Sequence, residues 1–269
     1  MERKQIIFPN GNVAWVVIPP KNAGYPEILQ ALTIQQAKAL VLVIGGAKNL
    51  DDSRKDTLYP LFSNGIASTA AELGAFIIDG GTKSGVMEMM GQAVAEQERQ
   101  SVLLGVAPED KVTYQSQPTD EPSDGKTHLD PNHSHFVLVK GGKWGDETAT
   151  MFGLVKELAQ DAPVVTVLVG GGDIAKQEVL QSVRQGWPVI VIAGSGELAD
   201  DIANWWRQKQ AKPSFIQRVL RRPKPSLTIS DRDIAEIIEA GDIYPFSHTG
   251  RPEELKALLK YLFLTERSE

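Results

Sequence analysis

The 269-residue sequence contains no cysteine, which excludes disulfide scaffolds, thiolate metal sites and cysteine nucleophiles. It also lacks a hydrophobic run of membrane-spanning length, because runs such as 164–169 are far shorter than the roughly 20 residues that cross a bilayer. The N-terminus carries basic residues but no apolar signal-peptide core. These absences predict a soluble, cytoplasmic protein with no membrane partner.

Positive charge is scarce as well. Lys and Arg number 28 against 34 Asp and Glu, which gives a formal net charge of -6. Nonspecific nucleic-acid binding needs positive potential over the phosphates, so we expect no nucleic-acid partner, although a local pocket for a small anion remains compatible. An apolar fraction of 42% with 23% charged residues supports a sizeable core and argues against disorder.

A repeating order of strand, glycine turn and helix begins at residue 40. Before it, the apolar runs 5–8 and 13–18 flank Asn10-Gly11 and predict a β-hairpin. The later runs are apolar throughout, which is typical of parallel strands covered on both faces, and helical spacing between them predicts right-handed crossovers. Strands are predicted at 40–44, 75–78, 102–106, 136–139, 164–169 and 189–192. The predicted fold is an α/β, doubly wound, mostly parallel sheet with an N-terminal hairpin, in one domain over 1–269.

The remaining stretches interrupt this rhythm. Residues 114–131 predict a long exposed loop, and 230–240 and 252–263 predict two helices. Between 207 and 224 there are seven basic residues and no acidic one. This basic segment is either a solvated surface, a flap that supplies Arg to ligand phosphates, or a patch for an acidic partner. The neighbouring Trp205-Trp206 pair either stacks a base or packs in the core or a subunit interface, which is compatible with a homodimer.

Glycines end five of the predicted strands, at 45–46, 80–81, 141–142, 170–172 and 194–196. Ligands bind outside the carboxyl ends of such strands, where glycine lets the backbone approach phosphate at a helix N-terminus. A single glycine turn can serve geometry alone, but five together favour a phosphate-bearing ligand. The turn at 79–87 matches neither GxxxxGK[ST] nor GxGxxG, so ATP hydrolysis and a standard dinucleotide fingerprint have no support.

Four ordered segments give a resemblance to a known family. The sequence Asp79-Gly80-Gly81-Thr82-Lys83-Ser84-Gly85-Val86-Met87, followed by Gly91 and Val94, resembles a motif in the N-terminal region of melastatin-type transient receptor potential channels. Segments 129–139, 164–172 and 188–200 resemble the same region in the same order. The chain is similar to a stand-alone, prokaryotic-type version of that domain, in the SLOG superfamily with the Smf/DprA and Lonely-Guy proteins.

The resemblance implies a Rossmann-like fold that binds or senses a nucleotide-derived ligand. In some of the channels the corresponding region binds ADP-ribose, so the expected ligand is ADP-ribose, NAD or a nucleoside monophosphate, with no required cofactor. Asp200, early in a helix after its glycine turn, is either a ribose contact or a charge near the cap. The ligand-binding residues predicted in this way are Gly45, Gly46, Gly80, Gly81, Thr82, Lys83, Ser84, Gly85, Val86, Met87, Asn132, Gly170, Gly171, Gly172, Gly194, Ser195, Gly196 and Asp200.

The Lonely-Guy branch suggests an alternative, because it hydrolyses cytokinin nucleotides through a PGGxGTxxE motif. Glu178 falls at the Glu position of that motif, whereas Gly170 replaces its Pro and Ile174-Ala175 replaces its Gly-Thr pair. If the protein is an enzyme, Glu178 is therefore the catalytic candidate for N-glycosidic hydrolysis of a nucleotide or NAD. A third hypothesis is an interaction scaffold with a vestigial pocket.

Other titratable residues have two interpretations each. His128, His133 and His135 with Asp130 resemble a zinc cluster, but we favour Asn132 and His133 ordering the loop and His135 entering the strand, with no metal. A list of candidate acids or bases comprises Asp146, Glu147 and Glu178. The first two are favoured as helix-start charges that complement the helix dipole, and Glu178 is equally compatible with a helix-face charge.

Overall fold

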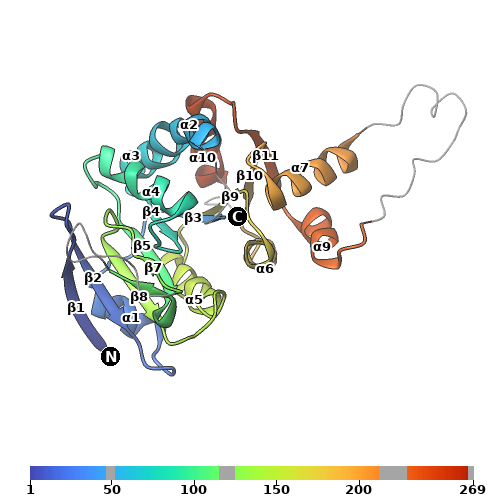
Figure 1. The fold of residues 1–269 in the computed structure, drawn as a ribbon. Helices are drawn as coiled ribbons and strands as arrows, with labels where there is room; N and C mark the ends of the chain where they lie inside the picture. Colours follow the sequence, from blue (N-terminus) through green and yellow to red (C-terminus); the bar gives the residue numbers. More distant parts are fainter. Residues whose placement is uncertain (47–51, 115–124, 212–228, 266–269) are drawn as a thin grey trace, which may run out of the picture.

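The computed structural model describes residues 1–46, 52–114, 125–211 and 229–265, and Figure 1 traces their fold. It is an α/β fold whose central sheet has nine strands, in the order β1-β2-β8-β5-β4-β3-β9-β10-β11. The strands are β1 (Glu2–Ile7), β2 (Val13–Ile18), β3 (Leu40–Gly45), β4 (Phe76–Asp79), β5 (Leu103–Pro108), β8 (His135–Val139), β9 (Val164–Val169), β10 (Val189–Ala193) and β11 (Ile243–Ser247).

Only the first pair of neighbouring strands is antiparallel among those described. Strands β1 and β2 form the predicted hairpin, and Gly11 has a positive φ of 81° in its turn. All other pairs in the large sheet are parallel, including β2 with β8, so the hairpin extends the sheet. The predicted hairpin and parallel strands are confirmed, which makes the fold Rossmann-like.

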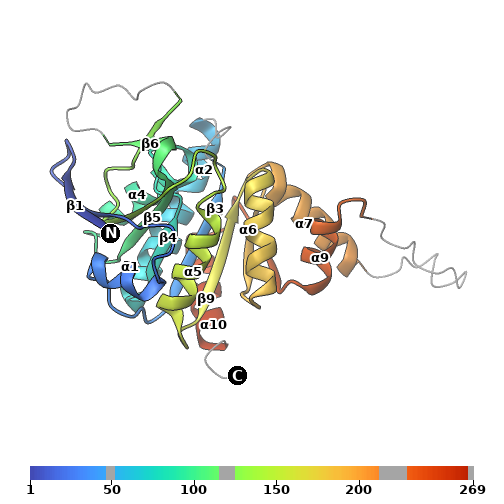
Figure 2. The same cartoon turned by 90° about the horizontal axis from the view of Figure 1, so that it is seen from below.

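The helices form a layer on each face of the sheet (Figures 1 and 2). One layer contains α1 (Tyr25–Leu32), α5 (Thr148–Ala159), α6 (Asp173–Arg184), α7 (Glu197–Gln210) and α9 (Arg232–Ala240). The other contains α2 (Asp52–Pro60), a π-helical turn η1 (Leu61–Ala67), α3 (Ser68–Leu73), α4 (Gly85–Glu96) and α10 (Pro252–Thr265). The helices predicted at 230–240 and 252–263 correspond to α9 and α10.

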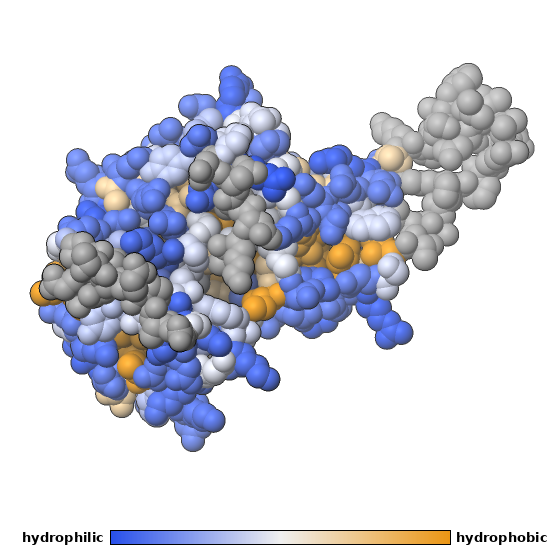
Figure 3. Space-filling view, viewed as in Figure 1, coloured by the Kyte–Doolittle hydropathy of each residue, from blue (hydrophilic) through white to orange (hydrophobic). Residues whose placement is uncertain are grey.

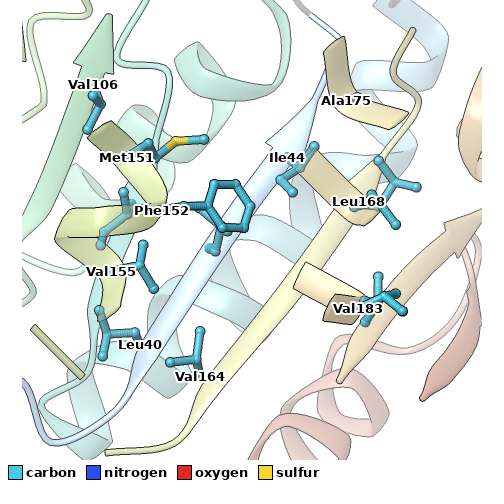
Figure 4. Packing of buried hydrophobic residues seen from close by; sticks show 14 of the residues in the cluster. Leu40, Ile44, Val106, Met151, Phe152, Val155, Val164, Leu168, Ala175 and Val183 are labelled. Atoms are coloured by element: carbon cyan, nitrogen blue, oxygen red, sulfur yellow. The ribbon is translucent and has the colours of Figure 1, made fainter. Parts of the chain in front are cut away.

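Alternate residues of the central strand enter the two layers. Leu40, Leu42 and Ile44 of β3 join the core under α5 and α6, whereas Val41 and Val43 join the core under α4 and α10. Figure 4 shows Met151, Phe152 and Val155 of α5 together with Leu40 and Ile44 of β3. Burial on both faces explains why the strand is apolar at every position, and each buried side chain of this size contributes about 1.5–3 kcal/mol.

The region after β5 is more ordered than the sequence predicts. A short 3-10 helix η2 (Glu109–Lys111) leads into β6 (Val112–Thr113), which pairs with β7 (Thr127–His128). Strand β7 thus lies inside the stretch predicted as a loop, of which 115–124 fall outside the described residues. Backbone pairing of Thr82 with Leu129 then attaches this region to the end of β4.

Helices α7 and α9 extend from the main body in Figure 1, and Figure 3 shows hydrophobic surface in the strip between them. Trp205 and Trp206 are partly buried against the core beneath α5 and α6. The basic segment begins in α7, where Lys209 Nζ donates to the carbonyl oxygens of Ile238 and Glu239 at the end of α9. Its residues 212–224 lie outside the described part of the chain. The homodimer remains a prediction.

Candidate functional site

The strand order of the sheet reverses at β3, and such a reversal places a crevice at the carboxyl end of the strand. Strands β4, β5 and β8 lie on one side of β3, and β9, β10 and β11 lie on the other. Helices after β4 and β9 therefore cover opposite faces, and such a reversal leaves an opening where ligands bind. A cavity of about 530 Å³ lies here, within the usual range for small-molecule sites. It is lined by Val43, Ile44, Gly45, Gly46, Gly80, Thr82, Ser84, Met87, Val106, Thr127, Trp144, Glu147, Met151, Gly172, Asp173, Ile174, Ala175, Glu178 and Glu197.

Backbone and hydroxyl groups form the wall of the cavity beside β3 and β4. A Cβ atom on Gly45 would lie 2.6 Å from Val86 Cγ2 and 2.7 Å from the Val169 carbonyl oxygen, so this position needs glycine for packing. Ser84 is the N-cap residue of α4 but makes no side-chain capping bond. Its Oγ atom lies 3.0 Å from Thr82 Oγ1. Two hydroxyl groups at a helix N-terminus can donate to an anion.

Carboxyl groups form part of the opposite wall. Glu178 of α6 is only 9% exposed, and Thr148 Oγ1 donates to its Oε1 atom over 3.2 Å. Burial and the nearby Glu147 carboxyl raise the pKa of Glu178 to about 8, because both disfavour its charged form. Glu147 Oε2 accepts from the Gly145 amide over 2.7 Å, and burial raises its pKa too. Glu147 precedes α5 as expected of a helix-start residue, yet it also faces the cavity.

The cavity brings together part of the predicted site. The predicted residues that line it are Gly45, Gly46, Gly80, Thr82, Ser84, Met87, Gly172 and Glu178. Four predicted neighbours, Gly81, Lys83, Gly85 and Val86, are not among the lining residues; Val86 is buried in the core against Gly45. Gly170 and Gly171, which precede Gly172, do not line it either.

The turn after β10 has a different set of contacts. Ser195 Oγ accepts from the Gly170 amide over 2.8 Å, which joins this turn to the turn after β9. Asp200 Oδ1 accepts from the Gly194 amide over 2.5 Å. A Cβ atom on Gly194 would lie 1.9 Å from His248 Nδ1. These contacts, like the position of Gly196 at the start of α7, connect elements of the fold, and none of the four predicted residues of this turn and helix lines the cavity.

The family match agrees with this arrangement. Residues 38–254 match the family model described as SLOG in TRPM, prokaryote. The chain belongs to this family.

Relatives of this SLOG chain include much longer ion-channel subunits. It is 29% identical over 217 residues to transient receptor potential cation channel subfamily M member 2 of Mus musculus, covering 68% of this chain and 14% of the channel. It is 29% identical over 203 residues to subfamily M member 6 of Homo sapiens, covering 65% and 10% respectively. Within the described residues, no helix combines the length and hydrophobicity needed to cross a bilayer.

A second buried cluster in the SLOG chain holds the loop before β8. His133 Nε2 lies 2.8 Å from Asp79 Oδ1, and its Nδ1 lies 2.9 Å from Asp130 Oδ2. Burial alone would lower the pKa of His133, but the two carboxyl groups raise it to about 10. A Cβ atom on Gly91 would lie 2.0 Å from Asp130 Oδ2, so glycine at this motif position makes room for the cluster. The described residues include no group of three or more His, Asp or Glu arranged to hold a metal ion.

The other predicted loop residues lie around this cluster. As expected, His135 enters a strand, β8, where burial lowers its pKa to about 4. Asn132 Oδ1 accepts from Asn10 and Arg99, so this predicted ligand residue joins the loop to the hairpin and lies outside the cavity lining. The sequence analysis predicts that both Asn132 and His133 order the loop. Of the two, His133 attaches the loop to the buried interior, through Asp79 of β4.

Several lining residues were not predicted. Thr127, Trp144, Ile174 and Glu197 come from four segments that meet only in the folded chain. The sequence did carry one signal for Trp144, because it follows the glycine pair at 141–142. No motif marked Thr127, which reaches the cavity through β7.

Proposed function

We propose that the pocket of this SLOG chain binds a nucleotide-derived ligand, ADP-ribose or an NAD-like molecule, and that the chain senses this ligand in the cytoplasm. The observation that carries the proposal is the cavity at the reversal of the sheet, where the Gly45-Gly46 and Gly80 turns meet the Thr82 and Ser84 hydroxyl groups. Amide groups and the helix dipole at the start of α4 favour negative charge. The ligand phosphates would lie at this end.

A thermal-shift series against ADP-ribose, NAD and AMP tests this proposal. A ligand at 100 times its Kd adds roughly 2.7 kcal/mol to the free energy of unfolding. For a domain of this size we expect an increase in Tm of about 5–10 °C. No shift with any of these ligands would disprove nucleotide binding and support the interaction scaffold.

A pair of double variants locates the phosphate end. Thr82→Val with Ser84→Ala should weaken binding about tenfold or more, because hydrogen bonds to charged groups contribute about 1.5–3 kcal/mol each. The matched control is Ser247→Ala with Thr249→Val, since these hydroxyl groups also lie 3.0 Å apart but outside the cavity lining. Equal Kd values for both double variants would contradict the proposed position of the phosphates.

A second candidate function is N-glycosidic hydrolysis, and the observation that favours it is the buried Glu178 carboxyl group in the cavity lining, where burial and Glu147 raise its pKa to about 8. A carboxyl group with a pKa near 8 is protonated at pH 7 and can act as a general acid. Glu178 would give its proton to the leaving base as the N-glycosidic bond breaks. Water would then add to the sugar carbon and return a proton to the carboxylate.

Chromatography of the ligand after incubation distinguishes a sensor from an enzyme. A sensor returns its ligand intact, whereas the hydrolase releases the free base. Glu178→Gln should abolish release of the base while leaving ADP-ribose binding largely intact. Equal turnover by the wild type and Glu178→Gln would rule out the general-acid role of Glu178.

A further inference from the structure

The charged side chains that line the cavity all carry the same sign. Among the described lining residues, the charged members are Glu147, Asp173, Glu178 and Glu197, and there is no Lys or Arg. Asp173 is exposed at the start of α6 and lies 3.5 Å from Lys176 Nζ, so it is partly neutralised. The two carboxyl groups withdrawn from solvent are Glu147 and Glu178.

Glu178 has an unused oxygen in the cavity wall. Within the described residues, the one hydrogen bond to its carboxyl group comes from Thr148 Oγ1 to Oε1, which leaves Oε2 without a protein donor. The Glu147 carboxyl group accepts from its own backbone amide and from the Gly145 amide. Because Glu178 lines the cavity, its Oε2 atom can accept a hydrogen bond from a ligand group there. A ligand group that carries positive charge would satisfy this oxygen and reduce the repulsion between the two carboxyl groups.

The rim of the cavity adds a flat apolar surface. Trp144 and Ile174 both line the cavity, and each is 40% exposed. Trp144 comes just before Glu147, the N-cap residue of α5, and Ile174 lies one helical turn before Glu178 in α6, so we assign the ring and the two carboxyl groups to one end of the cavity. An indole ring beside carboxyl groups suits a planar cation, through stacking and cation–π attraction.

We propose that this end of the cavity receives a positively charged, N-glycosylated aromatic ring, so that the site selects an oxidised pyridinium dinucleotide over its uncharged reduced form and over ADP-ribose. The inference rests on the proposed function, because the phosphates of the same ligand occupy the Thr82–Ser84 end. The further requirement is a positive charge on the part of the ligand that lies beside Glu147 and Glu178.

The charge requirement predicts a link between binding and pH. Asp146 acts on Glu147, and the Thr148 hydroxyl acts on Glu178. The other charged groups at this side of the cavity are Asp173, which lies beside Lys176 at the start of α6, and Glu197 on α7. A cation favours the ionised carboxylates, so its binding releases protons, and its affinity rises with pH. Binding of an uncharged ring has no such dependence.

Equilibrium binding of NAD⁺, NADH and ADP-ribose at pH 6 and pH 9 tests the inference. The first two probes differ in the charge of one ring. We expect NAD⁺ to bind about tenfold or more tightly than NADH at pH 9, with a smaller ratio at pH 6. Glu178→Gln should remove the preference and keep ADP-ribose binding, which also checks that the variant folds. Glu147→Gln should reduce the preference, and the control Glu239→Gln, on the exposed end of α9, should retain it.

Each outcome separates the two proposals. Equal Kd values for NAD⁺ and NADH at both pH values would overturn the charge requirement while leaving nucleotide binding intact. An undiminished preference in Glu178→Gln would overturn it as well. Failure of all three ligands to bind would disprove the proposed function, and the charge requirement with it.

Discussion

Two pairs of buried carboxyl groups lie near the carboxyl edge of the same sheet, and they differ in what separates their members. Asp79 and Asp130 face the two nitrogens of His133, at 2.8 and 2.9 Å. Glu147 and Glu178 face a cavity whose described lining includes no Lys or Arg, and burial together with Glu147 raises the pKa of Glu178. The first pair is bridged by a histidine, although Asp79 Oδ2 has no hydrogen-bond partner among the described residues, whereas the second pair lines the cavity.

Similar residue types thus hold the scaffold together in one place and line the cavity in another. A buried charge is tolerated when a partner of opposite sign compensates the loss of hydration. His133 provides that partner and attaches the loop to β4, so it is part of the scaffold. Among the described lining residues no Lys or Arg accompanies the glutamate pair, and burial together with neighbouring carboxyl groups raises the pKa of both. Strongly shifted groups in a cavity are candidates for function for this reason.

The largest expected effect is on the free energy of unfolding, which two substitutions should change in different directions. His133→Asn leaves two buried aspartates without their cation, and we expect it to lower the free energy of unfolding by about 3–5 kcal/mol. Glu178→Gln removes an uncompensated carboxyl group and should leave the stability unchanged or higher. Denaturant midpoints of both variants at pH 7 measure this. Comparable losses of stability in the two variants would show that the clusters are energetically alike.

The pH dependence of stability should separate the clusters by pH window. The pKa of His133 rises from 6.5 to about 10 on folding, so its contribution is complete below pH 6.5 and is lost as the pH rises through about 10. The pKa of Glu178 rises from 4.5 to about 8 on folding. Its contribution to the free energy of unfolding is therefore complete below pH 4.5 and is lost as the pH rises through about 8. Both effects lower the free energy of unfolding with increasing pH, and each group changes it by at most about 1.4 kcal/mol for every tenfold fall in proton concentration.

Chemical denaturation from pH 4.5 to 10 measures these windows. Glu178→Gln should flatten the profile between pH 4.5 and 8, and His133→Asn should flatten it between pH 6.5 and 10. His135→Asn serves as the histidine control, because burial lowers the pKa of His135 and it therefore lacks the alkaline window. If neither variant changes the dependence of the free energy of unfolding on pH, then the two clusters do not differ through the ionisation of His133 and Glu178.

The sequence predicts the sheet better than it predicts the cavity. Uninterrupted apolar runs such as Val164–Val169 identify strands because burial on both faces demands them. Strand β11 was missed, since Pro245 and polar neighbours obscure an edge strand that is only partly buried. Glycine motifs located the carboxyl edge but did not separate ligand contact from packing: Gly46 lines the cavity, whereas Gly81 closely approaches Gly105 and Phe136.

The partners of the glutamates were less predictable still. Glu147 and Thr148 lie at the start of α5, and they act on Glu178 only because α5 and α6 cover the same face. Local pattern carries no information on that arrangement, which depends on the order of β3, β8 and β9 in the sheet. The burial of Glu178 and its neighbours Glu147 and Thr148, which bear on the hypothesis that it is catalytic, are visible only in the fold and not in its motif.

The smallest expected effect concerns Thr148, whose hydroxyl donates to Glu178 Oε1 over 3.2 Å. This bond lowers the pKa of Glu178 against the effects of burial and Glu147. Thr148→Val keeps the shape and removes the donor, so the pKa of Glu178 should rise further, by less than about one pH unit for a hydrogen bond of roughly 1 kcal/mol. Carboxyl-carbon NMR titration measures the change, with the Glu178→Gln spectrum to assign the signal and Thr150→Val as the control on the same helix. A fall in the pKa of Glu178 on loss of the hydroxyl would mean that water in the cavity solvates its carboxyl group. Burial would then not be the main cause of its raised pKa, contrary to the comparison with the His133 cluster.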